Sequence, residues 1–149
     1  MSEGNDRIER SIRIAADADR VWELVSEPGW WINDGRITVH RIEPDGDVVT
    51  VHDPVHGAFP IRTVRLDPPR YAAFRWLAAD GAGRAVGDRS TLVEFWIEEH
   101  LQGGVLLRVV ESGLAALDTT EEQRRRDLDD HTEGWEAELA AARTFLHGA

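Results

Sequence analysis

The sequence predicts an α+β fold in which an antiparallel sheet of seven strands packs against one long C-terminal helix. Three observations predict it. Residues 119–146 carry apolar side chains at alternating steps of three and four, the period of one helix face. Most of the chain before them alternates with a period of two, which is typical of half-buried strands. The turns between these segments are short, and short connections mostly join antiparallel neighbours.

The predicted C-terminal helix needs a wide surface to pack on. At about 1.5 Å per residue it would be roughly 40 Å long, so a sheet is its most economical partner. Thr119 or Thr120 can cap its start, and Gly148 can end it. Its predicted buried face consists of Leu128, His131, Trp135, Leu139, Ala142 and Leu146.

Gly134 interrupts this helix. A glycine inside a helix costs about 1 kcal/mol relative to alanine, and it usually indicates that another backbone or a ligand comes close. We therefore expect the helix to approach the sheet closely beside Trp135.

The elements before the helix follow from the pattern of apolar residues. Ile8, Ile12 and Ile14 alternate on one face of a first strand, residues 7–14. Asp17 then caps a short helix, residues 18–26, and residues 27–31 form a second short helix. Six further strands are predicted at residues 36–43, 47–52, 59–67, 70–78, 91–100 and 105–112.

Composition limits the class of protein. A chain of 149 residues with 42% hydrophobic residues suits one globular domain, residues 1–149, with residues 1–6 as a flexible tail. The net charge is 17 − 28 = −11, which argues against binding to nucleic acid or to anionic membranes. There is no cysteine, which excludes disulfides and thiolate chemistry, and no apolar run long enough to span a bilayer. We expect a cytoplasmic protein.

Strand alternation predicts which side chains face the helix. On residues 91–100, Val93, Phe95 and Ile97 face inward, whereas Leu92 and Trp96 face outward. Trp96 either lies under charged neighbours or marks a patch where two copies form a homodimer. By the same parity the inner face includes Phe74, Trp76, Leu107 and Val109.

Several residues are candidates for chemistry. His131 lies on the apolar helix face one turn before Trp135, where it either contacts a ligand or is satisfied by a neighbour. Glu111 has the parity of Val109, so it either lies at the mouth of a cavity or, at the end of its strand, is solvated. If it points inward, we expect Arg62, His131 or water as its partner. Trp31 either forms an aromatic rim or fills the core.

Other chemistries find little support. His52, Asp53 and His56 have a spacing that suits a metal site on a helix, but Pro54 breaks any helix there. No serine lies in a nucleophile-elbow context, and the glycine-rich stretches lie between strands rather than ahead of helices, which predicts hairpin turns and not phosphate-binding loops. We expect no metal and no cofactor.

Five segments resemble a known family. They are V-W-E-L-V at residues 21–25, L-D-P-P-R-Y-A-A-F-R-W at 66–76, L-V-E-F at 92–95, V-E-S-G-L at 110–114 and H-T-E-G-W-E-A-E-L at 131–139. In this order they resemble the activator-of-Hsp90-ATPase-type branch of the START-like (SRPBCC) helix-grip superfamily. That superfamily also includes lipid-transfer, plant-allergen and polyketide cyclase or aromatase proteins. Residues 53–66 depart from its usual glycine-punctuated strand.

The resemblance implies a curved sheet whose concave face is crossed by the long helix, with a ligand cavity between them. The residues expected to line it are Trp31, Phe74, Trp76, Phe95, Leu107, Val109, Glu111, Leu128, His131, Trp135 and Leu139.

Three functions fit this picture. The first is binding of a small apolar or amphipathic molecule without turnover. The second is an enzyme of the cyclase or aromatase kind, in which Glu111, His131 or Arg62 polarises a ligand carbonyl. The third is an interaction with an Hsp90-type ATPase, although a lone acidic domain lacks the separate partner-binding domain of the eukaryotic activators.

Overall fold

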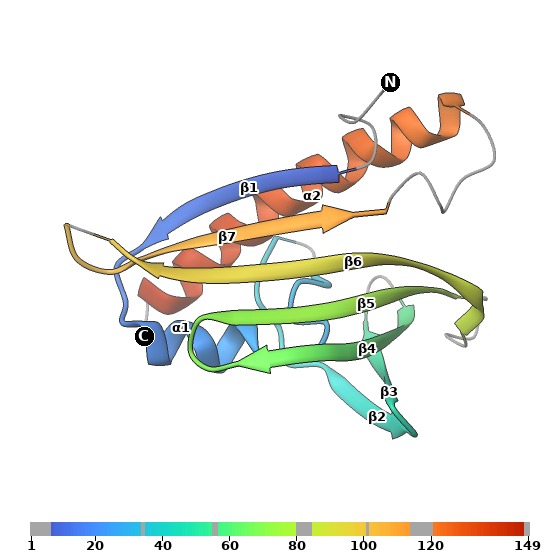
Figure 1. Ribbon diagram of the computed structural model, residues 1–149, viewed down its shortest axis with the longest axis horizontal. Helices are drawn as coiled ribbons and strands as arrows, with labels where there is room; N and C mark the ends of the chain where they lie inside the picture. The colour runs from blue at the N-terminus through green and yellow to red at the C-terminus, as the bar shows by residue number, and fades with distance from the viewer. Residues whose placement is uncertain are drawn as a thin grey trace.

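The period-two segments of the sequence form one antiparallel sheet of seven strands, with a long helix packed along it (Figure 1). In the sheet the strand order is β1-β7-β6-β5-β4-β3-β2, and every neighbouring pair is antiparallel. The computed structural model describes residues 7–33, 35–54, 57–79, 85–100, 102–113 and 121–147, with the backbone alone at 45, 78, 79, 85–89 and 121–129.

The strands lie where the alternation places them, with shifts at their ends. They are β1 (Arg7–Ile14), β2 (Arg41–Asp45), β3 (Val48–Asp53), β4 (Gly57–Asp67), β5 (Tyr71–Ala79), β6 (Ala85–Glu99) and β7 (Val105–Ser112). The predicted bounds of β1 and β7 are confirmed. The prediction for β6 started six residues too late, since 91 − 85 = 6.

The predicted strand over residues 36–43 is wrong at its start, because β2 begins at Arg41. Side chains of the preceding segment make the bonds that a strand ladder would otherwise supply. The Thr38 hydroxyl donates to Asn33 Oδ1 at 2.7 Å, and His40 Nε2 lies 3.0 Å from Asp53 Oδ1. Such local side-chain bonds compete with regular secondary structure.

The short helix α1 (Ala18–Val25) has Asp17 as its N-cap, whose carboxylate accepts from the backbone N–H of Arg20 at 2.9 Å. A second short helix was predicted at residues 27–31. Two successive turns occur there instead, closed by the bonds Trp30 N–H to Glu27 and Ile32 N–H to Gly29. The prediction of two short helices is therefore half correct.

The long helix α2 (Glu121–His147) buries the predicted face from its middle to its end. His147 Nε2 accepts from the Ala15 N–H at 2.7 Å, which ties the C-terminal end of α2 beside α1 (Figure 1). The predicted caps Thr119, Thr120 and Gly148 lie outside the described residues. Within the described ranges, no helix is both long and apolar enough to cross a membrane.

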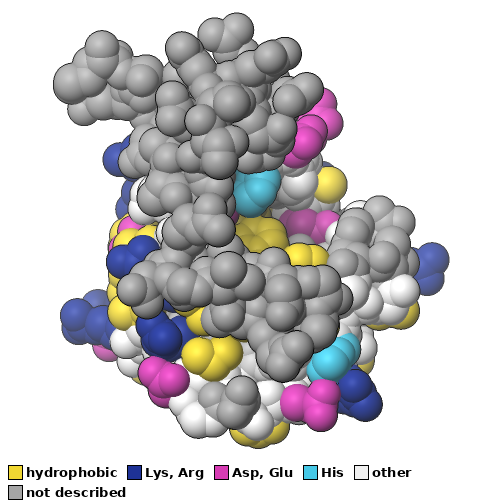
Figure 2. Space-filling model, turned by 90° about the vertical axis from the view of Figure 1, so that its right-hand side faces the viewer, with side chains coloured by type: hydrophobic (Ala, Val, Ile, Leu, Met, Phe, Trp, Pro, Cys, Tyr) yellow, Lys and Arg dark blue, Asp and Glu magenta, His cyan; other side chains and the backbone are white. Residues whose placement is uncertain are grey.

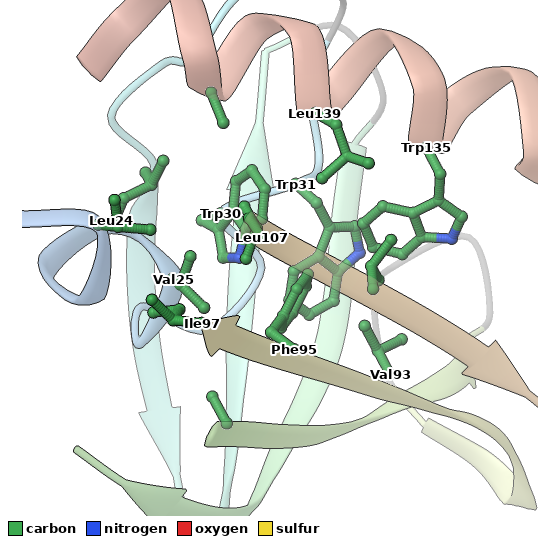
Figure 3. Close-up of a cluster of buried hydrophobic side chains, with 14 of the residues drawn as sticks. Leu24, Val25, Trp30, Trp31, Val93, Phe95, Ile97, Leu107, Trp135 and Leu139 are labelled. Atoms are coloured by element: carbon green, nitrogen blue, oxygen red, sulfur yellow. The ribbon is translucent and has the colours of Figure 1, made fainter. Parts of the chain in front are cut away.

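The core lies between α2 and the inner face of the sheet (Figure 3). Trp30 and Trp31 enter it from the turn after α1, and Trp135 and Leu139 enter it from α2. The predicted inner-face residues Phe74, Val93, Phe95, Leu107 and Val109 are fully buried, and Ile97 is 5% exposed. Burial of apolar area at this density is the main stabilising force of the fold.

The outer face of the sheet carries Trp96, as predicted. The Arg108 guanidinium lies 4.3 Å from the centre of its ring, and the Tyr71 ring lies 5.3 Å away. Trp96 is thus covered by a charged neighbour, the first of the two predicted alternatives. The Tyr71 hydroxyl donates to the Glu94 carboxylate.

Tyr71 predicts how stability falls at alkaline pH. Burial, together with the hydrogen bond to Glu94 and the charge of that carboxylate, raises the pKa of Tyr71 to about 12. The unfolded tyrosine ionises near pH 10, so this contribution to stability is complete below pH 10 and is lost as the pH rises through about 12.

Urea denaturation from pH 9 to pH 12 should show this loss, and Tyr71→Phe should remove it. Other side chains contribute little to the pH dependence between pH 9 and pH 12, because the sequence contains no lysine, no cysteine and a single tyrosine. An equal loss of stability in the Phe variant would contradict the prediction.

The β6–β7 turn predicts a contrast between two adjacent glycines. Both have positive φ, +92° at Gly103 and +73° at Gly104. A Cβ at Gly104 would lie 2.3 Å from the Ile14 carbonyl oxygen, whereas nothing lies within 4 Å of one at Gly103. Gly103→Ala should therefore cost only the left-handed strain, roughly 1–2 kcal/mol.

Gly104→Ala should cost about 1–3 kcal/mol more, since the neighbouring strand must move. Chemical denaturation of both variants measures the difference. If both variants lose the same free energy of unfolding, β1 shifts away from the added methyl group without an energetic cost, which contradicts the prediction.

Candidate functional site

The site is built around the carboxylate of Glu111 on β7. Glu111 shares the inward parity of Leu107 and Val109, and it lies opposite Val93 of β6 and Ile8 of β1 in the sheet. Its exposed fraction is 0%, so it lies beneath α2, neither at a cavity mouth nor in solvent, the two alternatives that the sequence left open. A carboxylate buried this deeply needs hydrogen-bond donors.

Three donors surround it. The indole N–H of Trp135 donates to Glu111 Oε1 at 2.9 Å, and His131 Nδ1 lies 2.8 Å from the same oxygen. The Thr91 hydroxyl donates to Oε2 at 2.7 Å. Two neighbouring turns of α2 and one strand therefore meet at a single carboxylate, which fixes the helix on the sheet.

The hydrogen bond to an ionised Glu111 places a proton on Nδ1 of His131. An ionised carboxylate only accepts, so Nδ1 carries the proton, and in the neutral ring Nε2 is then an acceptor. The ring packs on Trp76, with centroids 5.5 Å apart. The side chain is 28% exposed and forms part of a cavity wall.

A cavity of about 320 Å³ opens beside His131, on the side of α2 that faces the turn after α1. Figure 2 shows hydrophobic side chains in a hollow on this side of the molecule, next to a histidine and acidic groups. The residues that line it are Trp31, Ile32, Asn33, Phe59, Trp76, Asp130, His131, Gly134, Trp135 and Glu138.

Aromatic rings make most of its apolar wall. The Trp31 ring lies 5.7 Å from that of Trp76 and 5.8 Å from that of Trp135, and Phe59 lies 6.2 Å from Trp76. Trp31 is also 5.5 Å from the core rings of Phe74 and Phe95. The wall is thus continuous with the core, and it is held at aromatic contact distances.

A second buried carboxylate, Glu138 of α2, also lines the cavity. Its Oε1 accepts from the Asn33 amide at 2.9 Å, and its Oε2 accepts from the Gly35 backbone N–H at 3.2 Å. The same amide of Asn33 donates to the Trp30 carbonyl at 2.6 Å. These bonds attach the segment that carries Trp31 to the helix that carries Trp135.

Four of the residues predicted to contact a ligand line the cavity: Trp31, Trp76, His131 and Trp135. Glu111 contacts two of them from below. The side chain of Leu128 lies outside the described residues. Other predicted wall residues instead belong to the packed core, at 0–2% exposure, because α2 closes on the sheet there: Phe74, Phe95, Leu107, Val109 and Leu139.

Arg62 is not a partner of Glu111. Its guanidinium Nε lies 3.2 Å from Asp47 Oδ2, and its side chain is 45% exposed. Arg62 lies on β4, where residues 62–67 are all exposed. Of the partners suggested for Glu111, His131 bonds to it, whereas Arg62 pairs with Asp47.

The expectation for Gly134 is also wrong in part. Nothing lies within 4 Å of a Cβ built there, so the helix does not approach the sheet backbone at this point. Gly134 lines the cavity instead. A missing side chain is compatible with a close contact or with an open space, and the sequence alone does not distinguish them.

Sequence reasoning missed five lining residues, namely Ile32, Asn33, Phe59, Asp130 and Glu138, and it singled out Gly134 only for the close approach of another backbone or a ligand. Glu138 had one usable signal, since it lies three residues after Trp135 and so near the apolar face of α2. The structure does not bring the residues of the considered metal site, His52, Asp53 and His56, together as ligands. His52 pairs with Glu43, and His56 is outside the described residues. Within the described residues, no cluster of three or more His, Asp or Glu could hold a metal.

The fold and this site define a helix-grip protein, in which a curved antiparallel sheet holds a long C-terminal helix. Residues 15–144 match the family described as Activator of Hsp90 ATPase homolog 1-like protein, and the chain belongs to that family. The resemblance found in the sequence is thereby confirmed. No curated protein matches the chain.

Solved structures share the fold at low identity. MLL2253 from Mesorhizobium loti is 16% identical, with a TM-score of 0.70 over 96% of this chain and 98% of that one. Ms6760 from Mycobacterium smegmatis is 15% identical, with a TM-score of 0.66 over 97% and 92%. CalU16 from Micromonospora echinospora is 21% identical, with a TM-score of 0.61 over 95% and 74%.

The three donors at Glu111 predict a large stability effect. Glu111→Ala would leave the Trp135 indole and the Thr91 hydroxyl without their acceptor, at about 1–3 kcal/mol for each buried group. We expect a loss of about 3 kcal/mol or more in the free energy of unfolding, measured by urea denaturation. Thr91→Val is the control, since it removes one donor and leaves Glu111 two, and it should lose about 1 kcal/mol. Equal losses would refute the central role of the carboxylate.

Proposed function

We propose that this protein binds a small apolar or amphipathic molecule in the cavity between α2, β4, β5 and the turn after α1. The observation that carries the proposal is an open space of about 320 Å³ with aromatic walls and a few polar groups. Small-molecule sites typically have volumes of about 300–1,000 Å³ and this kind of lining. The family to which the chain belongs has the same fold.

The cavity is maintained by features that lower stability. Gly134 costs about 1 kcal/mol of helix propensity, although an alanine would meet no neighbour there. The half-buried faces of Trp76 and Phe59 remain in contact with water. A ligand that covers these faces would bind chiefly by removing apolar area from water.

A second candidate function is acid–base catalysis in the same cavity. The observation in its favour is the carboxylate–histidine pair, because Glu111 orients a ring that lines the space. Turnover of a bound carbonyl compound would distinguish this candidate from binding alone. No feature of this cavity supports the Hsp90-type interaction that the family name suggests.

Gly134 provides the test. Gly134→Leu should fill the cavity and weaken binding of the neutral probe N-phenyl-1-naphthylamine by tenfold or more, measured by the probe's fluorescence. Gly134→Ala adds only a methyl group and should bind within about twofold of the wild type. Both variants should melt at or above the wild-type temperature, since both residues favour helix over glycine.

The comparison of Gly134→Leu with Gly134→Ala separates the effect of filling the cavity from general effects on folding. If Gly134→Leu is folded and still binds the probe like the wild type, the site lies elsewhere and the proposal fails.

A further inference from the structure

We propose that a groove between α1, residues 37–40 and the C-terminal end of α2 binds a basic amphipathic helix of another protein. The groove has a volume of about 640 Å³. Its lining residues are different from those of the cavity beside His131. The inference therefore concerns a second site and does not depend on the proposed binding of a small molecule.

Part of this groove is apolar and open to solvent. Val39 is 97% exposed and Phe145 is 50% exposed, although both are large hydrophobic residues. They line the groove together with Leu24, Trp30 and Leu146, which belong to the core. Single exposed hydrophobic residues are common on protein surfaces, but several that border one groove are typical of a surface that contacts another molecule.

The same groove is strongly acidic, which defines the charge of its partner. Its lining includes the carboxylates of Asp17, Asp19, Glu23 and Glu27 and the guanidinium of Arg20, a net charge of 1 − 4 = −3. Within the described part of the chain, no ion pair involves Asp19, Glu23 or Glu27. Such a surface attracts a cationic partner and repels nucleic acids and anionic membranes.

Glu23 lies at a position where its charge does not stabilise α1. It follows Asp19 by four residues, and like charges at this spacing destabilise a helix. Glu23 is also in the last turn of α1, where the helix dipole disfavours a negative charge and where α1 has no basic residue. A lysine or arginine of a partner beside these two carboxylates would offset both unfavourable effects.

The spacing of the two carboxylates favours a helical partner. Asp19 and Glu23 lie on one side of α1, about 6 Å apart along the helix axis. Basic residues four positions apart on a second helix repeat this distance, and the apolar face of that helix would cover Val39 and Phe145. An amphipathic helix bound in an apolar groove is a common mode of peptide recognition.

A model helix tests the inference with the full chain. The fluorescein-labelled peptide L-K-K-L-L-K-L-L-K-K-L-L-K-L is titrated with the protein at about 0.15 M salt, where charge interactions over more than about 8 Å are screened. Fluorescence anisotropy measures its binding. We expect binding to be weaker by about tenfold or more for two related peptides, one with glutamate in place of every lysine and one with serine in place of every leucine.

Paired variants assign the binding to the groove. Glu23→Gln with Glu27→Gln should weaken binding of the peptide about fivefold, as for two surface ion pairs. Glu133→Gln with Glu136→Gln is the matched control, because it removes the same charge from exposed residues outside the groove. It should bind within about twofold of the wild type. Phe145→Ala removes apolar contact area and should also weaken binding about fivefold.

Several outcomes would overturn the inference. If the control pair weakens binding as much as the groove pair, the peptide responds only to the net charge of the protein. The inference also fails if the serine peptide binds like the leucine peptide, or if none of the peptides binds. Tighter binding to phosphatidylglycerol vesicles than to the peptide would make the groove a membrane contact instead.

Gly134→Leu separates this inference from the proposed function. It fills the cavity beside His131 and lies outside the groove, so it should leave binding of the peptide unchanged. Loss of peptide binding in this variant would place the peptide in that cavity and overturn the inference.

Discussion

The rest of the structure depends on one buried carboxylate. Glu111 has no exposed surface, and its oxygens accept from two residues of α2 and one of β6. His131 and Trp135 lie one helical turn apart and reach the same oxygen, so α2 can neither turn about its axis nor slide along the sheet without breaking a bond. A nonpolar contact would not impose this restriction, because apolar surfaces attract one another without direction. The carboxylate thus determines which side chains α2 presents to the sheet.

That restriction divides α2 into two parts with different roles. Toward its C-terminal end Leu139, Ala142 and Leu146 close on the core at 0–5% exposure. At Gly134 the helix stands away from its surroundings, and the cavity occupies the space. Packing of the C-terminal part of α2 stabilises the fold, which allows the part around Gly134 to border an open cavity. Glu111 lies at the boundary, so stability and the geometry of the cavity are coupled through it.

Sequence patterns predicted the elements that packing controls and missed those that local polar bonds control. Alternation was sufficient for β1 and β7, whose bounds and faces are as predicted, because one side of each strand is buried. It failed at residues 36–40, where Thr38 and His40 bond to Asn33 and Asp53 in place of a ladder. The site was predictable to the extent that it lies on regular elements, as His131 and Trp135 do. Asn33 and Glu138 were missed because their meeting depends on a turn whose path no periodicity encodes.

Trp31 connects the cavity to the core more directly than any other wall residue. Its ring lies within 6 Å of four other aromatic rings, two in the wall, Trp76 and Trp135, and two in the core, Phe74 and Phe95. Its indole N–H is buried without a hydrogen-bond partner in the described residues, so no polar bond holds the ring. Its position is instead set by packing among rings and by the Asn33–Glu138 bond that anchors its segment to α2. A molecule that contacts Trp31 in the cavity would therefore also contact a ring shared with the core, so the binding that we propose would be coupled to the packing that stabilises the fold.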